Sequence, residues 1–299
     1  MRWQVYEWNF RLKSPLHIGF HKIMHFFKTR PYVPGKILWA ALTAKLTPML
    51  GINDYKKVGE FLKKIIRFGY LYPYVEEKLY LLKYTEEGLK FGSLNQNEFE
   101  KRFITSMASA AIEHESLTAE EGMLHEVEFI SPYTIDDVKP VYLKGLFWLR
   151  EFSEDGFAIS KKNNGITIAH NIEVDFKSQL ANRFQIGGER KYGFGLVELK
   201  ELNEISTNEF NGWSGKWREE NEEVCISINS DNFIWSHVLH SNNLNIKGHI
   251  EPLVGREWEA TKGAGRKLTS HGLFWSPGSI LCEDRTLKIT KLGFWETLD

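Results

Sequence analysis

A glycine-rich segment at residues 187–195 has the composition of a ligand-binding loop. It reads GGERKYGFG, with four glycines, two cations and two aromatic residues. Glycines permit positive φ angles and close approach of the backbone, so that successive N–H groups can turn toward an anion. Arg190 and Lys191 add positive charge, while Tyr192 and Phe194 offer flat faces to a base. Phosphate contacts combined with ring stacking are typical of single-stranded RNA binding.

This glycine-rich segment does not fit the common nucleotide-binding loops. No Gly-Lys-Ser/Thr follows it, as a P-loop requires, and its glycine spacing differs from GxGxxG. It also leads into a predicted strand, whereas the dinucleotide fingerprint leads into a helix. The alternative interpretation is a glycine-rich β-turn with a solvated basic tip, and the segment by itself leaves both open.

A second basic and glycine-rich stretch spans residues 255–279, and we interpret it as a loop. Its cations could contact phosphates, and Trp258 or Phe274 could stack on a base or a partner. A surface loop with merely solvated cations is an equal alternative. The cations concerned are Arg256, Lys262, Arg266 and Lys267.

Three histidines, His17, His21 and His25, are spaced four residues apart. On a helix this spacing would align three imidazoles for zinc binding or for acid–base chemistry. Pro15 and Gly19 argue against a regular helix, and no acidic or cysteine ligand is close. We therefore expect no metal here, and partly exposed loop histidines are the simpler interpretation.

The overall composition is that of a folded chain. It has 299 residues, 38 Lys and Arg against 39 Asp and Glu, and 42% hydrophobic residues, which permits two domains. No run approaches the roughly 20 apolar residues of a membrane span, and the first residues do not resemble an export signal. Cys225 and Cys282 have no spacing typical of a disulfide framework or zinc site. We expect a cytoplasmic protein without a cofactor.

Residue patterns predict the elements that position these segments. Residues 3–12 alternate as in a strand, and apolar residues in 36–46 recur as on a helix. The polar stretch 201–223 marks the candidate boundary before a smaller β-rich region. The remaining predictions are a helix at 54–68, a hairpin at 70–84, a helix and strand at 97–112, strands at 123–132, 141–152, 166–174 and 196–202, an exposed loop or hairpin tip at 153–165, and a helix at 176–184.

Four segments resemble the RAMP (repeat-associated mysterious protein) superfamily of CRISPR-associated proteins. They are SPLHIGF, PYVPGKILWAALTAKL, LTAEEGMLHEVEFISP and IGGERKYGFGLVEL, in matching order across about the first 200 residues. The resemblance implies an α+β fold with a ferredoxin-like (RRM-type) βαββαβ core in residues 1–205, and a smaller β-rich region in 206–299. The RNA-binding positions that it implies are His17, Gly19, Pro34, Gly35, Lys36, Gly187, Gly188, Arg190, Gly193 and Gly195.

The resemblance also implies a function in antiviral defence. The chain would be a non-catalytic, structural subunit of a type III CRISPR ribonucleoprotein effector complex that binds the guide RNA (crRNA). Its partners would be other RAMP subunits and the large polymerase-like subunit, with target RNA held indirectly.

Two features refine this expectation. Residues 20–33 contain no Asp or Glu, although subunits of the family that cut target RNA carry an acidic residue there. About 100 residues follow the glycine-rich segment, which favours a capping subunit near the 5′ handle of the guide. The alternatives are a repeated backbone subunit, or a metal-independent repeat endoribonuclease in which His21 or His25 acts on a 2′-OH.

Overall fold

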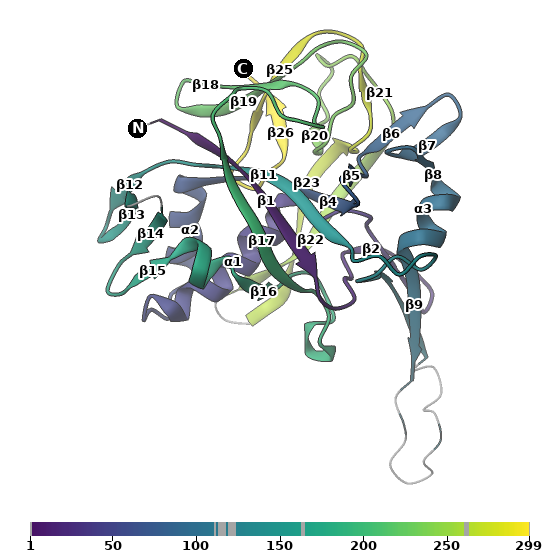
Figure 1. The fold of residues 1–299 in the computed structure, drawn as a ribbon, viewed down its shortest axis with the longest axis horizontal. Coiled ribbons are helices and arrows are strands. Elements are labelled where there is room, and N and C mark those ends of the chain that lie inside the picture. Colours follow the sequence, from purple (N-terminus) through teal and green to yellow (C-terminus); the bar gives the residue numbers. More distant parts are fainter. Residues whose placement is uncertain are drawn as a thin grey trace.

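The computed structural model describes residues 2–110, 112, 118, 124–162, 165–259 and 263–298. Its few helices and several β-sheets confirm the predicted α+β class (Figure 1). Within the described ranges, no helix combines the length and the apolar character that crossing a bilayer requires.

The main sheet has six strands, and every adjacent pair is antiparallel. β1 lies inside it, with Trp8 opposite Gly145 on one neighbour and opposite Leu202 on the other. The predicted strand at 141–152 is central, as expected from its dense apolar run. In spatial order the strands are β16 (Arg183–Gln185), β17 (Leu196–Ile205), β1 (Gln4–Leu12), β11 (Tyr142–Leu149), β4 (Ile66–Val75) and β5 (Lys78–Leu79).

Two helices, α1 (Gly35–Met49) and α2 (Tyr55–Ile65), pack behind this sheet in Figure 1. Both were expected from the spacing of their apolar residues, which are buried against the core. α2 begins at a capping residue, because the Asp54 carboxylate accepts a hydrogen bond from the N–H of Lys57.

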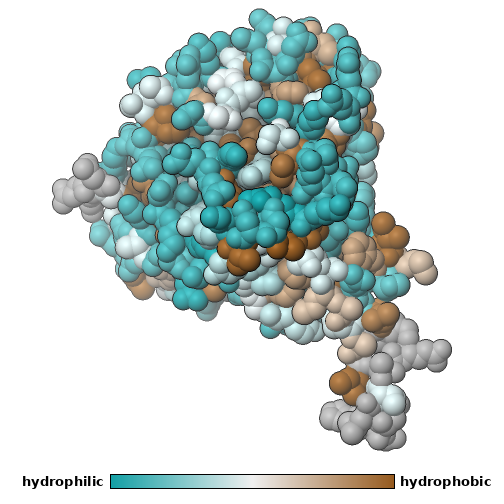
Figure 2. Space-filling model, turned by 45° about the vertical axis from the view of Figure 1, so that its right-hand side comes forward, coloured by the Kyte–Doolittle hydropathy of each residue, from teal (hydrophilic) through white to brown (hydrophobic). Residues whose placement is uncertain are grey.

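A smaller four-stranded sheet projects to the lower right in Figure 1. Its strands are, in spatial order, β2 (Gly19–Ile23), β3 (Phe26–Thr29), β10 (His125–Ile130) and β9 (Ile104–Ser109). Helix α3 (Gln96–Phe103) runs directly into β9, which confirms the helix and strand predicted at 97–112. Figure 2 shows apolar side chains toward the base of this projection. Among the residues of this sheet and its turns, Ile23, Met24 and Met107 are exposed.

Two further small sheets lie outside the main one. One is β6 (Leu82–Thr85), β7 (Gly88–Phe91) and β8 (Leu94–Asn95), next to α3. The other is β12 (Phe152–Glu154), β13 (Phe157–Lys162), β14 (Gly165–Ala169) and β15 (Glu173–Asp175). The turn-rich segment predicted at 153–165 therefore forms strands around a hairpin tip at Asp155 and Gly156.

The C-terminal part of the chain is β-rich and shares the core of the main sheet. Trp148 of β11 stacks with Trp235 at a centroid distance of 6.4 Å, and Trp235 meets Trp295 at 4.5 Å. Its seven-stranded sheet has the order β18 (Lys216–Glu220), β19 (Glu223–Ile228), β25 (Arg285–Ile289), β26 (Trp295–Thr297), β20 (Val238–Leu239), β23 (Gly263–Trp275) and β22 (Ile250–Glu259), and β21 (Ile246–Lys247) pairs with β24 (Ile280–Leu281).

The predicted helix at 176–184 is wrong beyond its first turn. Phe176–Leu180 forms a single π-helical turn, and the chain then enters β16. The Lys45 ammonium donates to the carbonyls of Gln179, Leu180 and Arg183, which ends the turn. Tertiary contacts therefore override the helical spacing here.

The predicted loop at 255–279 is also wrong, because most of it forms the long β22–β23 hairpin. Gly255 and Arg256 lie on β22, and Gly263, Gly265, Arg266 and Lys267 lie on β23. Arg256 faces Leu268 across the ladder, and Glu257 faces Lys267.

Candidate functional site

The glycine-rich segment forms a loop between β16 and β17, and we call residues 187–195 the glycine loop. Arg190–Tyr192 makes one 3₁₀ turn, flanked by Glu189 and Gly193 in the left-handed region. A Cβ added at Gly195, where φ is +77°, would lie 1.8 Å from the Ile186 carbonyl oxygen. At Gly193, where φ is +84°, a Cβ would meet no atom within 4 Å. Gly195 is therefore required by the fold, whereas Gly193 faces open space.

The glycine loop docks on the N-terminal segment SPLHIGF. The N–H of Gly188 donates to the His17 carbonyl over 2.9 Å, and that of Gly195 donates to the Pro15 carbonyl over 2.7 Å. The Ser14 hydroxyl accepts from the N–H of Leu196. The two segments thus lie side by side although they are about 180 residues apart in the chain. Each of them was identified on its own in the RAMP resemblance.

The side chains of the glycine loop divide into an exposed and a buried set. Arg190 and Lys191 are exposed, and Tyr192 is 71% exposed. Phe194 is buried and packs edge-on against Phe129 at a centroid distance of 5.4 Å. The expectation that Phe194 offers a stacking face is therefore corrected: its ring supports the loop from beneath, and Tyr192 is the ring that faces solvent.

The three histidines occupy different environments and share no helix. His17 is buried, and its Nδ1–H donates to the Glu128 carbonyl over 2.7 Å. His21 lies on β2, which begins at Gly19, and His25 lies in the turn between β2 and β3; both are exposed. Within the described residues, no group of three His, Cys, Asp or Glu side chains is arranged to hold a metal ion.

Lys36, expected to contact RNA, forms an ion pair instead. Its ammonium lies 2.6 Å from Oε1 of Glu257 and 2.6 Å from Nε2 of His271. Its side chain is 14% exposed. Burial alone would raise the pKa of Glu257, but the hydrogen bond and charge of Lys36 outweigh burial and lower it. Lys36 therefore fastens the β22–β23 hairpin to the start of α1, just after Pro34 and Gly35.

Three of the cations that were predicted to contact RNA are accessible on the β22–β23 hairpin. Arg256, Arg266 and Lys267 are exposed. Phe274 is buried, so it offers no stacking face, and it packs against Phe294. Lys262 and the side chain of Trp258 lie outside the described residues.

The fold as a whole is similar to that of chains in solved CRISPR complexes. One is a chain of the Type III-B Cmr-beta complex bound to cognate target RNA and AMPPnP, with a TM-score of 0.56 and 9% identity over 92% of this chain and 85% of that chain. Another comes from Cmr-beta bound to cognate target RNA, with a TM-score of 0.53 and 11% identity over 93% and 86%. No family model and no curated protein matches the sequence.

This chain has the fold of a Cmr-beta chain. The resemblance to type III CRISPR proteins that the sequence indicates is thus confirmed at the level of the fold. At 9–11% identity the likeness concerns the fold alone, and residue roles rest on the geometry of this chain.

A buried polar network that the sequence did not reveal joins the N-terminal and C-terminal parts. The Arg30 guanidinium donates to both carboxylate oxygens of Glu251, over 3.0 and 2.6 Å. Nε2 of His237 lies 2.8 Å from Glu251, and the Tyr70 hydroxyl lies 2.6 Å from Nδ1 of His237. Arg30 and Glu251 are 221 residues apart, so no local pattern could have paired them.

The network determines the ionisation of its members. Burial, together with the nearby Arg30 charge, lowers the pKa of His237 to about 4, even though Glu251 acts in the opposite direction. Burial would raise the pKa of Glu251, but hydrogen bonds from His237 and Arg30 hold it well below the usual range. His237 is therefore neutral at pH 7. Its Nε2–H donates to Glu251, and the Tyr70 hydroxyl donates to its Nδ1.

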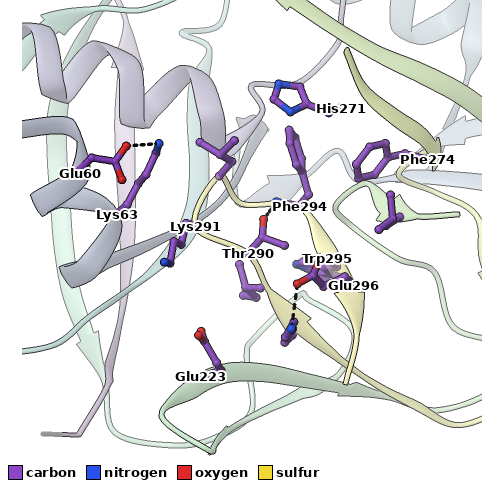
Figure 3. Close-up of a pocket in the computed structure, with 14 residues that line it drawn as sticks. Glu60, Lys63, Glu223, His271, Phe274, Thr290, Lys291, Phe294, Trp295 and Glu296 are labelled. Atoms are coloured by element: carbon purple, nitrogen blue, oxygen red, sulfur yellow. Dashed lines mark hydrogen bonds and ion pairs between the residues drawn. The ribbon is translucent and has the colours of Figure 1, made fainter. Parts of the chain in front are cut away.

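One cavity, with a volume of about 580 Å³, lies between α2, β23 and the last two strands (Figure 3). Its charged groups are largely matched: Lys63 pairs with Glu60 over 2.8 Å, and Lys288 pairs with Glu296 over 3.0 Å. Its aromatic walls, including Trp295, are buried core residues. These features favour a packing gap between elements over a ligand site.

Proposed function

We propose that this chain is a non-catalytic subunit of a type III CRISPR ribonucleoprotein complex, and that it binds guide RNA through the glycine loop. The observation that carries the proposal is the loop itself: Arg190, Lys191 and Tyr192 project from a backbone that is hydrogen-bonded to the SPLHIGF segment. Exposed cations beside an exposed ring suit the phosphates and bases of a single strand.

The arrangement of the main sheet supports a ferredoxin-like assignment. In chain order its principal strands are β1, β4, β11 and β17, and in space they run β17, β1, β11, β4. A split βαβ ferredoxin-like sheet has the same spatial order, in which the fourth strand of the chain is followed by the first, the third and the second. α1 and α2 occupy the first crossover, and the single π-helical turn stands in place of the second helix.

We further propose that the chain caps the complex near the 5′ handle of the guide. The C-terminal β-rich part follows the glycine loop in the chain and packs on the main sheet through Trp235. An additional body of this size suits a chain that ends an assembly better than one repeated along it.

Nuclease footprinting of guide RNA in the reconstituted complex, with and without this chain, tests the capping role. We expect omission of the chain to expose the 5′ handle and leave the spacer protected. Exposure at regular intervals along the spacer would instead indicate a repeated backbone subunit. Unchanged protection everywhere would contradict guide binding by this chain.

One observation favours a second candidate, metal-independent cleavage of repeat RNA. His21 lines a cavity together with Glu128 and Lys28, which brings an imidazole, a carboxylate and a cation together. Incubation with repeat RNA without added metal distinguishes the two functions. The non-catalytic proposal expects intact RNA. Site-specific cuts that disappear on changing His21→Ala and His25→Ala would establish the nuclease instead.

A further inference from the structure

A second cavity, with a volume of about 370 Å³, lies where three distant parts of the chain meet. The β2–β3 hairpin, residues 82–104 and the region around His249 each contribute to its lining, and we call it the Tyr84 cleft. Its volume falls within the range of small-ligand sites, which are roughly 300–1,000 Å³. The cleft is separate from the glycine loop, and no sequence pattern indicated it.

Flat groups line the opening of the Tyr84 cleft. The rings of Tyr84 and His249 are nearly parallel, at 18°, with centroids 6.5 Å apart. Phe20, which is 38% exposed, lies against the Arg30 guanidinium at 4.4 Å. Tyr84 is half-buried and His249 is exposed, so a planar ligand can reach both.

Polar side chains that are held in place by hydrogen bonds line the cleft next to these flat groups. Arg30 is held by Glu251 and by the Tyr32 hydroxyl, and these hydrogen bonds engage three of the five N–H groups of a guanidinium. The remaining donors belong to a side chain that lines the cleft and is fixed in place. The Glu128 carboxylate, which accepts from the N–H of Thr29, adds an acceptor.

The groups of the cleft match the parts of a nucleotide. Planar rings stack on a base, fixed donors and acceptors bind its edge, and a cation such as Lys28 attracts its phosphate. An apolar peptide side chain would not bind the remaining Arg30 donors or the Glu128 carboxylate, so these polar groups favour a nucleotide over a protein ligand.

Hydrogen bonds also connect the cleft to the glycine loop. The Glu128 carbonyl accepts from His17, and the His17 carbonyl accepts from Gly188 of the loop. One residue, His17, therefore connects Glu128 of the cleft to Gly188 of the glycine loop.

We propose that the Tyr84 cleft binds one nucleotide of the RNA strand that the glycine loop contacts, with its base against Tyr84 and His249 and its phosphate toward Lys28. This inference rests on the proposed function. It adds a base-binding position, which would make the chain sensitive to the presence of a base at one site in the strand.

The test uses the full chain and short single-stranded repeat RNAs, each with one 4-thiouridine at a different position. We expect one position to photocrosslink to the cleft, at Tyr84 or His249. Tyr84→Leu should weaken RNA binding about tenfold, which corresponds to about 1.4 kcal/mol and lies within the range for one stacked base. An abasic nucleotide at the crosslinked position should weaken binding to the wild-type chain by the same factor as Tyr84→Leu. The Tyr84→Leu variant should bind the abasic RNA and the normal RNA with the same affinity.

Matched controls separate the cleft from general effects. Tyr74→Leu removes another half-buried tyrosine, on β4 and outside the cleft, and should bind RNA like wild type. Lys28→Ala should weaken binding, whereas Lys90→Ala should not, because Lys90 lies on β7, next to the strand of Tyr84, but does not line the cleft. Melting temperatures of all four variants show whether each is folded.

Each contrary outcome has a distinct meaning. If Arg190→Ala with Lys191→Ala weakens RNA binding but Tyr84→Leu behaves like Tyr74→Leu, the cleft proposal is overturned and the proposed function stands. If the wild-type chain binds no RNA alone or in the reconstituted complex, both are overturned.

Two other ligands are further outcomes. Saturable binding of AMP to the cleft, with no crosslink from RNA, would assign the site to a free nucleotide and overturn the RNA assignment. Loss of partner-subunit capture by Tyr84→Leu with unchanged RNA binding would assign the cleft to a protein side chain, which also overturns it.

Discussion

Glu251→Gln should be among the most destabilising conservative changes in the chain. The substitution keeps the shape of the side chain but removes the negative charge that faces Arg30, whose side chain is 11% exposed. A buried ion pair that loses one partner leaves an uncompensated charge, at a cost of about 3–5 kcal/mol. For a chain of this size that corresponds to a decrease in melting temperature of roughly 5–8 °C.

The assay is thermal and urea unfolding, with Glu60→Gln as the matched control. Glu60 pairs with Lys63 on α2, but 55% of its side chain is exposed, so its loss should not be measurable. Arg30→Gln should also destabilise, and the double variant should cost at least about 1 kcal/mol less than the sum of the two single changes. A Glu251→Gln protein as stable as the control, or single changes that simply add, would refute the reasoning.

Two further predictions concern acid stability and the glycine loop. Because the pKa of His237 is lowered from 6.5 to about 4, the unfolded chain binds this proton first, and unfolding free energy should fall by up to about 3 kcal/mol as the pH drops from 6.5 to 4. His237→Phe should flatten this part of the stability–pH curve, and an unchanged slope would contradict it. Gly195→Ala should cost about 3 kcal/mol or more, because its Cβ would overlap the Ile186 carbonyl, whereas Gly193→Ala should cost about 1 kcal/mol. Equal melting temperatures for these two variants would contradict the described loop geometry.

Local patterns predicted the elements whose structure is determined locally. The apolar spacing in 36–46 and 54–68 produced α1 and α2, and the dense run at 141–152 produced a central strand. The same reasoning failed at 176–184, where the helix ends after one turn. There the Lys45 ammonium donates hydrogen bonds to three backbone carbonyls. It failed again at 255–279, where glycines and cations within strands resemble a loop.

The site was predictable in its segments but not in its contacts. The glycine loop was identified from composition, yet nothing local distinguishes the exposed Tyr192 from the buried Phe194, because Phe129, which covers Phe194, lies far away in the chain. Likewise, the pairing of Lys36 with Glu257 depends on a partner 221 residues away. Such contacts are decided by tertiary packing.

The salt dependence of RNA binding by Arg190→Ala with Lys191→Ala tests the central claim most directly. Both side chains are exposed on the glycine loop, so the variant should keep the wild-type melting temperature. If both contact phosphates of a single strand, the slope of log K against log salt should decrease in magnitude by about 1.4, at about 0.7 per contact. Lys56→Ala with Lys57→Ala, which removes the same charge from α2, should leave the slope unchanged. Equal slopes and affinities for wild type and the glycine-loop variant would contradict guide-RNA binding by this loop.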